Sequence, residues 1–134
     1  FTYKKKNSSY ILQKKDKTYK EFHGEIPIND IGRRLREIAR IENKSFKILT
    51  GYGSSSGKSL SKDAAIKSLK KMKKDNLIKG FLPGEIKNII LKENDYFYLD
   101  KVKFINIIKN DPDYGNDGII FVFMWKESKK ALFF

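Results

Sequence analysis

The chain has 134 residues, the size of one domain and enough to bury roughly two-thirds of the unfolded surface. The absence of cysteine excludes disulfides, thiolate zinc sites and a cysteine nucleophile, and no apolar run reaches the roughly 18 residues that span a membrane. Because no signal-peptide pattern leads the chain, we expect a soluble, cytoplasmic protein. Since the first residue is Phe1 and not Met, we also expect a piece of a longer chain.

The net charge of +13 is the strongest compositional signal, and lysine supplies most of it. A basic domain of this size is typical of a polyanion-binding protein, since each phosphate that it neutralises releases counterions. The alternative is a lysine-rich genome bias, which raises the charge without any partner and suits the many Ile and Asn residues.

The first part of the chain is predicted to hold a basic arm, a strand and a helix. Residues 1–18 mix lysine clusters with a short apolar patch, and Thr18 to Phe22 are predicted to form a strand that ends at His23 and Gly24. After Pro27, residues 30–42 fit a helix whose apolar stripe consists of Ile31, Leu35, Ile38 and Ile41. Another face of this helix carries Arg33, Arg36 and Arg40.

Residues 45–50 are predicted to form a second strand, and a helix then runs from Ser59 or Ser61 to about Asp75. The core stripe of that helix is Ala65, Leu69 and Met72, and its basic face is Lys67, Lys70, Lys71 and Lys74. A third strand covers residues 78–82. Residues 118–124 form a continuous apolar run, typical of a strand that is covered on both faces.

Residues 85–110 carry mixed signals. Ile86, Ile89 and Ile90 suit a helix, whereas Tyr96, Tyr98, Val102 and Phe104 suit strands. We predict a helical turn, an extended piece and a short helix here. Alternating strands and helices predict a single α/β domain over residues 19–125, a layered sandwich with a mixed sheet, followed by a tail at 126–134.

A glycine-rich loop joins the second strand to the lysine-rich helix, with glycines at 51, 53 and 57 and serines at 54–56 and 59. Strand, glycine-rich loop and helix form an anion site, because the backbone approaches the ligand and free N–H groups point at it. The nucleotide-binding P-loop pattern would need a glycine at position 52, where this chain has Tyr52. The alternative is a tight strand-to-helix turn without a ligand.

Three separated stretches together resemble the small MutS-related (Smr) domain family. Residues 21–24 (Glu-Phe-His-Gly) resemble the family's Leu-Asp-x-His-Gly opening, and Thr50-Gly51-Tyr52-Gly53 with Ser55 or Ser56 resembles its Gly-x-Gly loop. Residues 115–118 (Gly-Asn-Asp-Gly), leading into the last apolar run, resemble its final turn and strand. The resemblance covers roughly residues 19–83 and 112–124.

The resemblance implies a compact α/β domain similar to the C-terminal domain of translation initiation factor three. It also implies nucleic acid as the partner, DNA or RNA, in some relatives ribosome-associated RNA, and in some relatives endonuclease activity. The chain departs from the pattern at Glu21, where the family has aspartate, and at Lys20, where it has leucine. It also carries an insertion at residues 84–111, which could be a specificity element.

On a strand, Glu21 and His23 would emerge on one face, and an imidazole beside a carboxylate is a suitable acid/base pair for phosphodiester hydrolysis. The alternative is a histidine that hydrogen-bonds the backbone at a strand end. A phosphate would lie on the N–H groups of residues 53–57 and pair with Lys58. The proposed phosphate contacts are Thr50, Gly51, Gly53, Ser55, Ser56, Gly57 and Lys58. Gly24, Gly115 and Gly118 are assigned to turns, where Gly115 and Gly118 are expected to have positive φ.

The arginine and lysine faces are predicted to track phosphates without reading sequence, or else to be ordinary solvated helix faces. Tyr52, Tyr96, Phe97 and Tyr98 are candidates for base stacking. We predict no cofactor, since a Mg²⁺ or Mn²⁺ site at Glu21 and Asp117 has no sequence signature. The predicted function is nucleic-acid binding with possible endonuclease activity. The alternatives are a non-catalytic RNA or ribosome adaptor and an interaction domain for an acidic protein.

Overall fold

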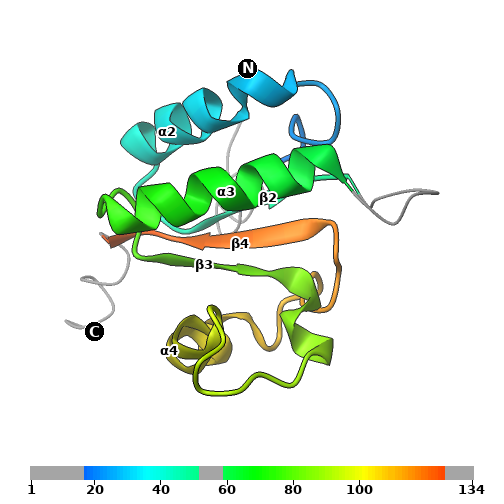
Figure 1. Cartoon of the computed structure of the whole chain (residues 1–134), viewed down its shortest axis with the longest axis vertical. Coiled ribbons are helices and arrows are strands. Elements are labelled where there is room, and N and C mark those ends of the chain that lie inside the picture. The colour runs from blue at the N-terminus through cyan, green and yellow to red at the C-terminus, as the bar shows by residue number, and fades with distance from the viewer. Residues whose placement is uncertain (1–16, 52–58, 126–134) are drawn as a thin grey trace, which may run out of the picture.

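Four short strands in the described part of the chain form one mixed sheet in the order β1-β2-β4-β3. The computed structural model describes residues 17–51 and 59–125. The strands are β1 (Lys17–Tyr19), β2 (Phe46–Leu49), β3 (Gly80–Pro83) and β4 (Ile119–Phe123). β1 pairs with β2 in parallel, whereas β4 lies between β2 and β3 and runs antiparallel to both (Figure 1).

Helices cover both faces of this sheet. α2 (Ile31–Ile41) and α3 (Leu60–Lys74) pack on one face, and α4 (Tyr98–Ile108) lies on the other (Figure 1). Two 3₁₀ helices are also present in the described ranges: η1 (Ile28–Asp30) leads into α2, and η2 (Gly84–Asn88) follows β3. This arrangement confirms the predicted layered α/β sandwich with a mixed sheet. None of the helices in the described ranges is long and apolar enough to cross a membrane.

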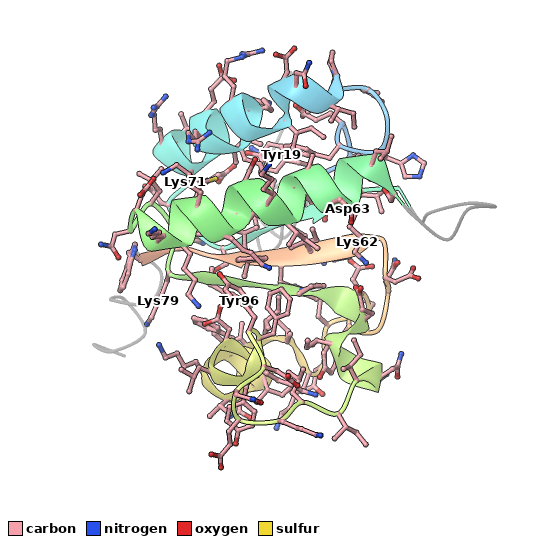
Figure 2. All side chains as sticks on the ribbon, in the orientation of Figure 1. Tyr19, Lys62, Asp63, Lys71, Lys79 and Tyr96 are labelled. Atoms are coloured by element: carbon pink, nitrogen blue, oxygen red, sulfur yellow. The ribbon has the colours of Figure 1, made fainter. Side chains whose placement is uncertain are left out.

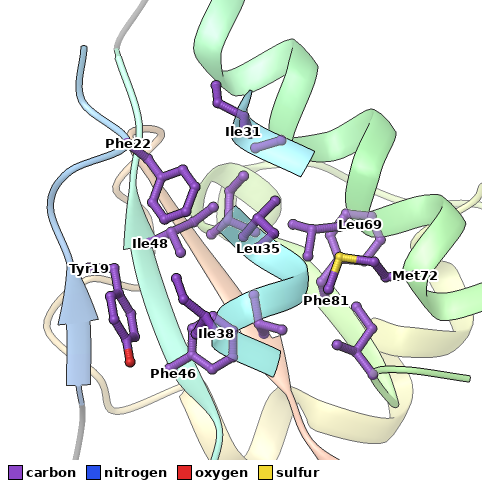
Figure 3. Close-up of a cluster of buried hydrophobic side chains, with 14 of the residues drawn as sticks. Tyr19, Phe22, Ile31, Leu35, Ile38, Phe46, Ile48, Leu69, Met72 and Phe81 are labelled. Atoms are coloured by element: carbon purple, nitrogen blue, oxygen red, sulfur yellow. The ribbon is translucent and has the colours of Figure 1, made fainter. Parts of the chain in front are cut away.

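The larger core lies between the sheet and the α2–α3 pair (Figure 3). The predicted stripes supply it: Ile31, Leu35 and Ile38 of α2 and Ala65, Leu69 and Met72 of α3 are fully buried. Ile41 was predicted to belong to this stripe and does not, since it is the last residue of α2 and is 67% exposed. Gly32 lets the two helices approach, because a Cβ there would lie 2.8 Å from Oγ of Ser68.

The smaller core lies on the opposite face of the sheet, where α4 and η2 cover β3 and β4. Phe104 of α4 stacks on Phe123 of β4 with ring centroids 4.0 Å apart. All five residues of β4 are buried, as the continuous apolar run predicted for a strand covered on both faces. Residues 85–110 follow the prediction at both ends, with a helical turn in η2 and the helix α4, but residues 93–97 form turns where an extended piece was predicted.

The first strand is shorter than predicted. β1 ends at Tyr19 and residues 21–25 form turns, so the predicted strand over Thr18 to Phe22 is wrong in its second half. The turn lets Phe22 enter the larger core, where it is fully buried. β1 also begins one residue earlier than the predicted strand, at Lys17, which the sequence assigned to the arm. Residues 1–16 of that arm and the tail at 126–134 lie outside the described ranges.

Candidate functional site

The described parts of the three stretches on which the family resemblance depends lie at one edge of the sheet. Tyr19 pairs with Ile48, and Ile48 and Pro83 both pair with Ile120. The carboxyl ends of β1, β2 and β3 and the start of β4 therefore share this edge, and so do the described residues next to these strand ends (Figure 1). Loops gathered at the carboxyl ends of strands are a common place for ligands in α/β sheets.

The second and third stretches are joined by hydrogen bonds at Thr50. Its backbone N–H donates to the carbonyl of Gly118 at 2.7 Å, and its hydroxyl donates to the same oxygen at 3.2 Å. Thr50 is fully buried. The residue that the sequence assigned to phosphate binding thus holds the start of β4 against the end of β2.

Hydrogen bonds from backbone and hydroxyl groups connect Gly51 to the N-terminus of α3. Its N–H donates to Oγ of Ser61 at 3.2 Å, and Oγ of Ser59 lies 3.1 Å from the same hydroxyl. Ser59 is the N-cap of α3 and accepts from the N–H of Lys62, as serine does at helix starts. A Cβ on Gly51 would lie 3.0 Å from Oγ of Ser59, so this position favours glycine.

Lys62 connects α3 to two other segments of the edge. Its ammonium donates to the carboxylate of Glu85 at 2.6 Å and to the carbonyl of Asp117 at 2.8 Å. Figure 2 shows Lys62 directed from the first turns of α3 toward the loops below the helix. The side chain is only 15% exposed, so this charge organises the edge rather than facing solvent.

The final turn packs tightly against η2. The N–H of Gly115 donates to the carbonyl of Gly84 at 2.9 Å, and a Cβ on Gly84 would lie 2.0 Å from the carbonyl oxygen of Asn116. Gly115 has the predicted positive φ, at +107°. Gly118 does not, so that prediction is wrong; its N–H instead donates to Oδ1 of Asn116 at 2.9 Å, which closes the turn.

The first stretch adopts a different geometry from the predicted one. Because Glu21 and His23 lie in a turn, the strand alternation that was expected to put both side chains on one face does not apply. The Glu21 carboxylate accepts hydrogen bonds from Nε of Arg34 at 2.6 Å and from Nη2 at 3.5 Å. The pKa of Arg34 is raised, chiefly by this hydrogen bond. His23 is exposed, and Gly24 has φ of +96°.

The predicted arginine face is partly neutralised within α2. Arg33 forms ion pairs with Asp30 and Glu37 at 3.6 and 3.2 Å. Arg36 is half-buried and Arg40 is exposed, and neither forms an ion pair with the acidic residues of the described chain. These two side chains are thus the ones on this face whose charge is available for phosphates.

The predicted lysine face of α3 is exposed at all four positions, Lys67, Lys70, Lys71 and Lys74. Lys71 is paired with Asp75 at 3.2 Å, and Figure 2 shows it near the C-terminal end of α3. Lys70 lies over the ring of Tyr96, with its ammonium 4.6 Å from the centroid. Lys67 and Lys74 form no ion pair with described residues and are open to solvent.

Five predicted contacts lie outside the described ranges: Gly53, Ser55, Ser56, Gly57 and Lys58. The structure therefore describes the two ends of the glycine-rich loop, at Gly51 and Ser59. Among the residues that it describes, no group of three or more His, Asp or Glu side chains could hold a metal ion.

The sequence did not identify Lys62, Ser61 or Glu85 as members of this edge. Lys62 and Glu85 are 23 positions apart, and neither belongs to a motif, so only the folded chain brings them together. The one available signal was the position of Lys62 close to Ser59 and Ser61, where the helix was predicted to begin, which places it in the first turn.

Comparison of the chain with protein-family models, with curated proteins and with solved structures gave no match. The resemblance to Smr domains therefore stays a prediction from the three sequence stretches.

Proposed function

We propose that this chain is a nucleic-acid-binding domain, similar to Smr domains, that holds backbone phosphates at the sheet edge formed by its three glycine-containing stretches. The observation that carries the proposal is the convergence of these stretches, which lie far apart in sequence and continue from strand ends on one edge. The start of α3 contributes there the N–H groups and partial positive charge of a helix N-terminus.

The charge distribution supports the same partner. The net charge is +13, and exposed basic side chains line the outer surfaces of both helices on one face of the sheet. Lys67, Lys74 and Arg40 are exposed and form no ion pair with described residues, so a polyanion would not first have to displace an internal carboxylate. Contacts of this kind position a nucleic acid without reading its sequence.

The test is the salt dependence of binding to a fluorescently labelled duplex and to a structured RNA. We expect log affinity to fall linearly with log salt concentration, with a slope that reports the number of phosphates contacted. Lys67→Ala should reduce that slope by about 1. Lys109→Ala, at the far end of α4, is the control with the same charge change. A slope near zero for the unaltered chain would contradict phosphate binding and would favour an acidic protein partner.

Phosphodiester cleavage is the second candidate. It is favoured by His23, which is exposed in the turn that follows β1 at the same edge, and which is the one histidine of the sequence. In this role His23 would take a proton from the attacking nucleophile or deliver one to the leaving oxygen. Glu21 was expected to orient it, but this carboxylate is engaged by Arg34.

Cleavage is tested by incubating the pure protein with supercoiled plasmid and with structured RNA. If His23 transfers the proton, His23→Ala abolishes cleavage, whereas Glu21→Gln reduces it only through the local fold. Cleavage that persists in His23→Ala would exclude this mechanism. A chain that binds both nucleic acids and cleaves neither would act as a non-catalytic RNA or ribosome adaptor.

A further inference from the structure

The segment between β3 and β4 places an exposed aromatic ring among lysines, away from the edge described above. Tyr96, which directly precedes α4, is 45% exposed. The ammonium groups of Lys70 and Lys73, both on α3, lie 4.6 and 5.3 Å from its ring centroid. Figure 2 shows Tyr96 between α3 and α4, on the same side of the molecule as Lys79.

The Tyr96 ring is held firmly from below. It packs edge-on against Phe97 with centroids 5.0 Å apart and contacts Phe81 of β3 at 6.1 Å. Beneath it, the fully buried carboxylate of Asp100 accepts from Lys73 at 3.0 Å and from the N–H of Phe81 at 3.3 Å. Burial, with the charge of Asp100, raises the pKa of Tyr96. The ring is therefore a fixed surface feature.

A second exposed ring continues this surface. Trp125 is 41% exposed, and its Nε1 donates to the carbonyl of Asn76 at 3.2 Å. The Lys79 ammonium lies 5.7 Å from the Trp125 ring and 5.8 Å from the ring of Phe104. A Cβ on Gly80 would lie 2.8 Å from Asp100, which is next to Tyr96, and 2.9 Å from Phe104, which is next to Lys79. The residues around Tyr96 and those around Trp125 therefore adjoin at Gly80.

We propose that this surface, formed by Lys70, Lys73, Lys79, Tyr96 and Trp125, binds single-stranded nucleic acid by stacking unpaired bases on its two rings. The proposal rests on the nucleic-acid-binding function above and names its substrate class. Aromatic platforms interleaved with cations are how proteins bind single strands, because every base offers a π-face and every linkage a phosphate. A duplex keeps its bases paired and offers only phosphates here.

Lys70 gives the surface a way to accept a base. Its side chain is exposed and lies over the ring on a flexible stem, whereas Lys73 is fixed by Asp100. A base that stacks on Tyr96 displaces the Lys70 ammonium from the ring face, and that ammonium is then within reach of the adjoining phosphate. The Lys70 ammonium therefore contacts the Tyr96 ring in the free protein and a phosphate in the complex.

The experiment compares three ligands of equal length, about 12 nucleotides. They are oligothymidylate, an abasic oligomer with the same phosphates, and a duplex. Because Trp125 is the one tryptophan of the sequence, its fluorescence reports stacking at this surface. We expect oligothymidylate to quench Trp125 and to bind about tenfold more tightly than the abasic oligomer, which binds without quenching.

The matched variants are Tyr96→Leu, Tyr96→Phe and Lys109→Ala, each checked for unchanged circular dichroism. We expect Tyr96→Leu to lose most of the preference for thymidylate over the abasic oligomer and Tyr96→Phe to keep it. Lys109→Ala, at the opposite end of α4, should leave the preference unchanged.

Equal affinity for thymidylate and the abasic oligomer, or tight binding of thymidylate without quenching of Trp125, would overturn base stacking but would not contradict phosphate binding. Binding of none of the three would overturn the proposed function as well. The comparison of ligands uses the unaltered chain, so it decides the question even where Tyr96→Leu fails to fold.

Discussion

Lys73 of α3 and Asp100 of α4 form a salt bridge that joins the two helices beside β3, the outer strand of the sheet, with the ammonium 3.0 Å from each carboxylate oxygen. Asp100 is fully buried, and the Lys73 side chain is 30% exposed. The pair also reaches β3 through the N–H of Phe81. It is therefore a polar link between α3 and the segment that joins β3 to β4, as is the pair of Lys62 with Glu85.

Removing the lysine of this pair should destabilise the fold. Lys73→Met leaves the Asp100 carboxylate buried without its counter-charge, and we expect a loss of about 3 kcal/mol in urea unfolding, the low end for a broken buried pair because water partly reaches Lys73. Lys71→Met is the matched control. Its pair with Asp75 is exposed on both sides, so the expected loss is below about 1 kcal/mol. Equal losses in both variants would contradict the structural role of Lys73.

A methyl group at Gly84 should separate η2 from the final turn. A Cβ there would lie 2.0 Å from the Asn116 carbonyl oxygen, a backbone atom that cannot move aside, so Gly84→Ala should cost about 3 kcal/mol or more in thermal unfolding. Gly24→Ala is the comparison, since nothing lies within 4 Å of its Cβ position. Its positive φ should cost only about 1 kcal/mol. A mild effect at Gly84 would mean that the two segments are not in contact.

The hydroxyl of Thr50 should contribute to stability and not to ligand binding. Thr50→Val keeps the shape of the side chain but loses the bond to the Gly118 carbonyl, which still accepts from the backbone N–H. We expect a loss of about 1 kcal/mol in urea unfolding and unchanged affinity for nucleic acid. Thr50→Ser should retain the bond. Weaker binding without a change in stability would place the hydroxyl at the ligand.

Stability should fall at alkaline pH. Burial raises the pKa of Tyr19, and its hydrogen bond to Glu42 adds to that shift. Burial opposes the charge on Lys47, but the hydrogen bonds and charges of Asp113 and Asp111 outweigh it and raise the pKa of the ammonium. Both groups therefore hold protons in the folded state that the unfolded chain releases above about pH 10.

This contribution is complete below the unfolded pKa values and is lost as the pH rises through the folded ones. We expect the urea midpoint to be constant from about pH 7 to pH 9 and to fall above about pH 10. Tyr19→Phe should show a shallower fall, because it removes one of the groups that hold a proton in the folded state. A midpoint that rises through this range would contradict the direction of both shifts.

The sequence predicted the helices and the inner strands because their signals are local. The stripes at Leu35 and Leu69 and the apolar run of β4 each mark burial by periodicity or composition alone. The first strand failed for the same reason: Phe22 fits the alternation of a strand, but the chain brings it to the core through a turn.

The candidate site was predictable only in part. Glycine is typical of loops and serine of helix starts, so the sequence predicted the loop at Gly51 and the helix start near Ser59. The pairing of Glu21 with Arg34, and of Lys73 with Asp100, joins residues 13 and 27 positions apart through packing that no local pattern encodes. Charge was visible in the sequence, but which charges are neutralised was not.

The position of β4 has a consequence for the order in which this chain acquires its structure during synthesis. Within the described residues β3 pairs with β4 alone, and β2 reaches β3 only through it. Thr50 and Gly118, which join the second strand to the last, are 68 positions apart. A ribosome-bound chain from which Ile119 to Phe123 have not yet emerged cannot form the complete sheet. The apolar faces of α2, α3 and β3 then remain exposed to solvent. Folding is thus delayed to the end of this segment and is slowed by its long loop closures.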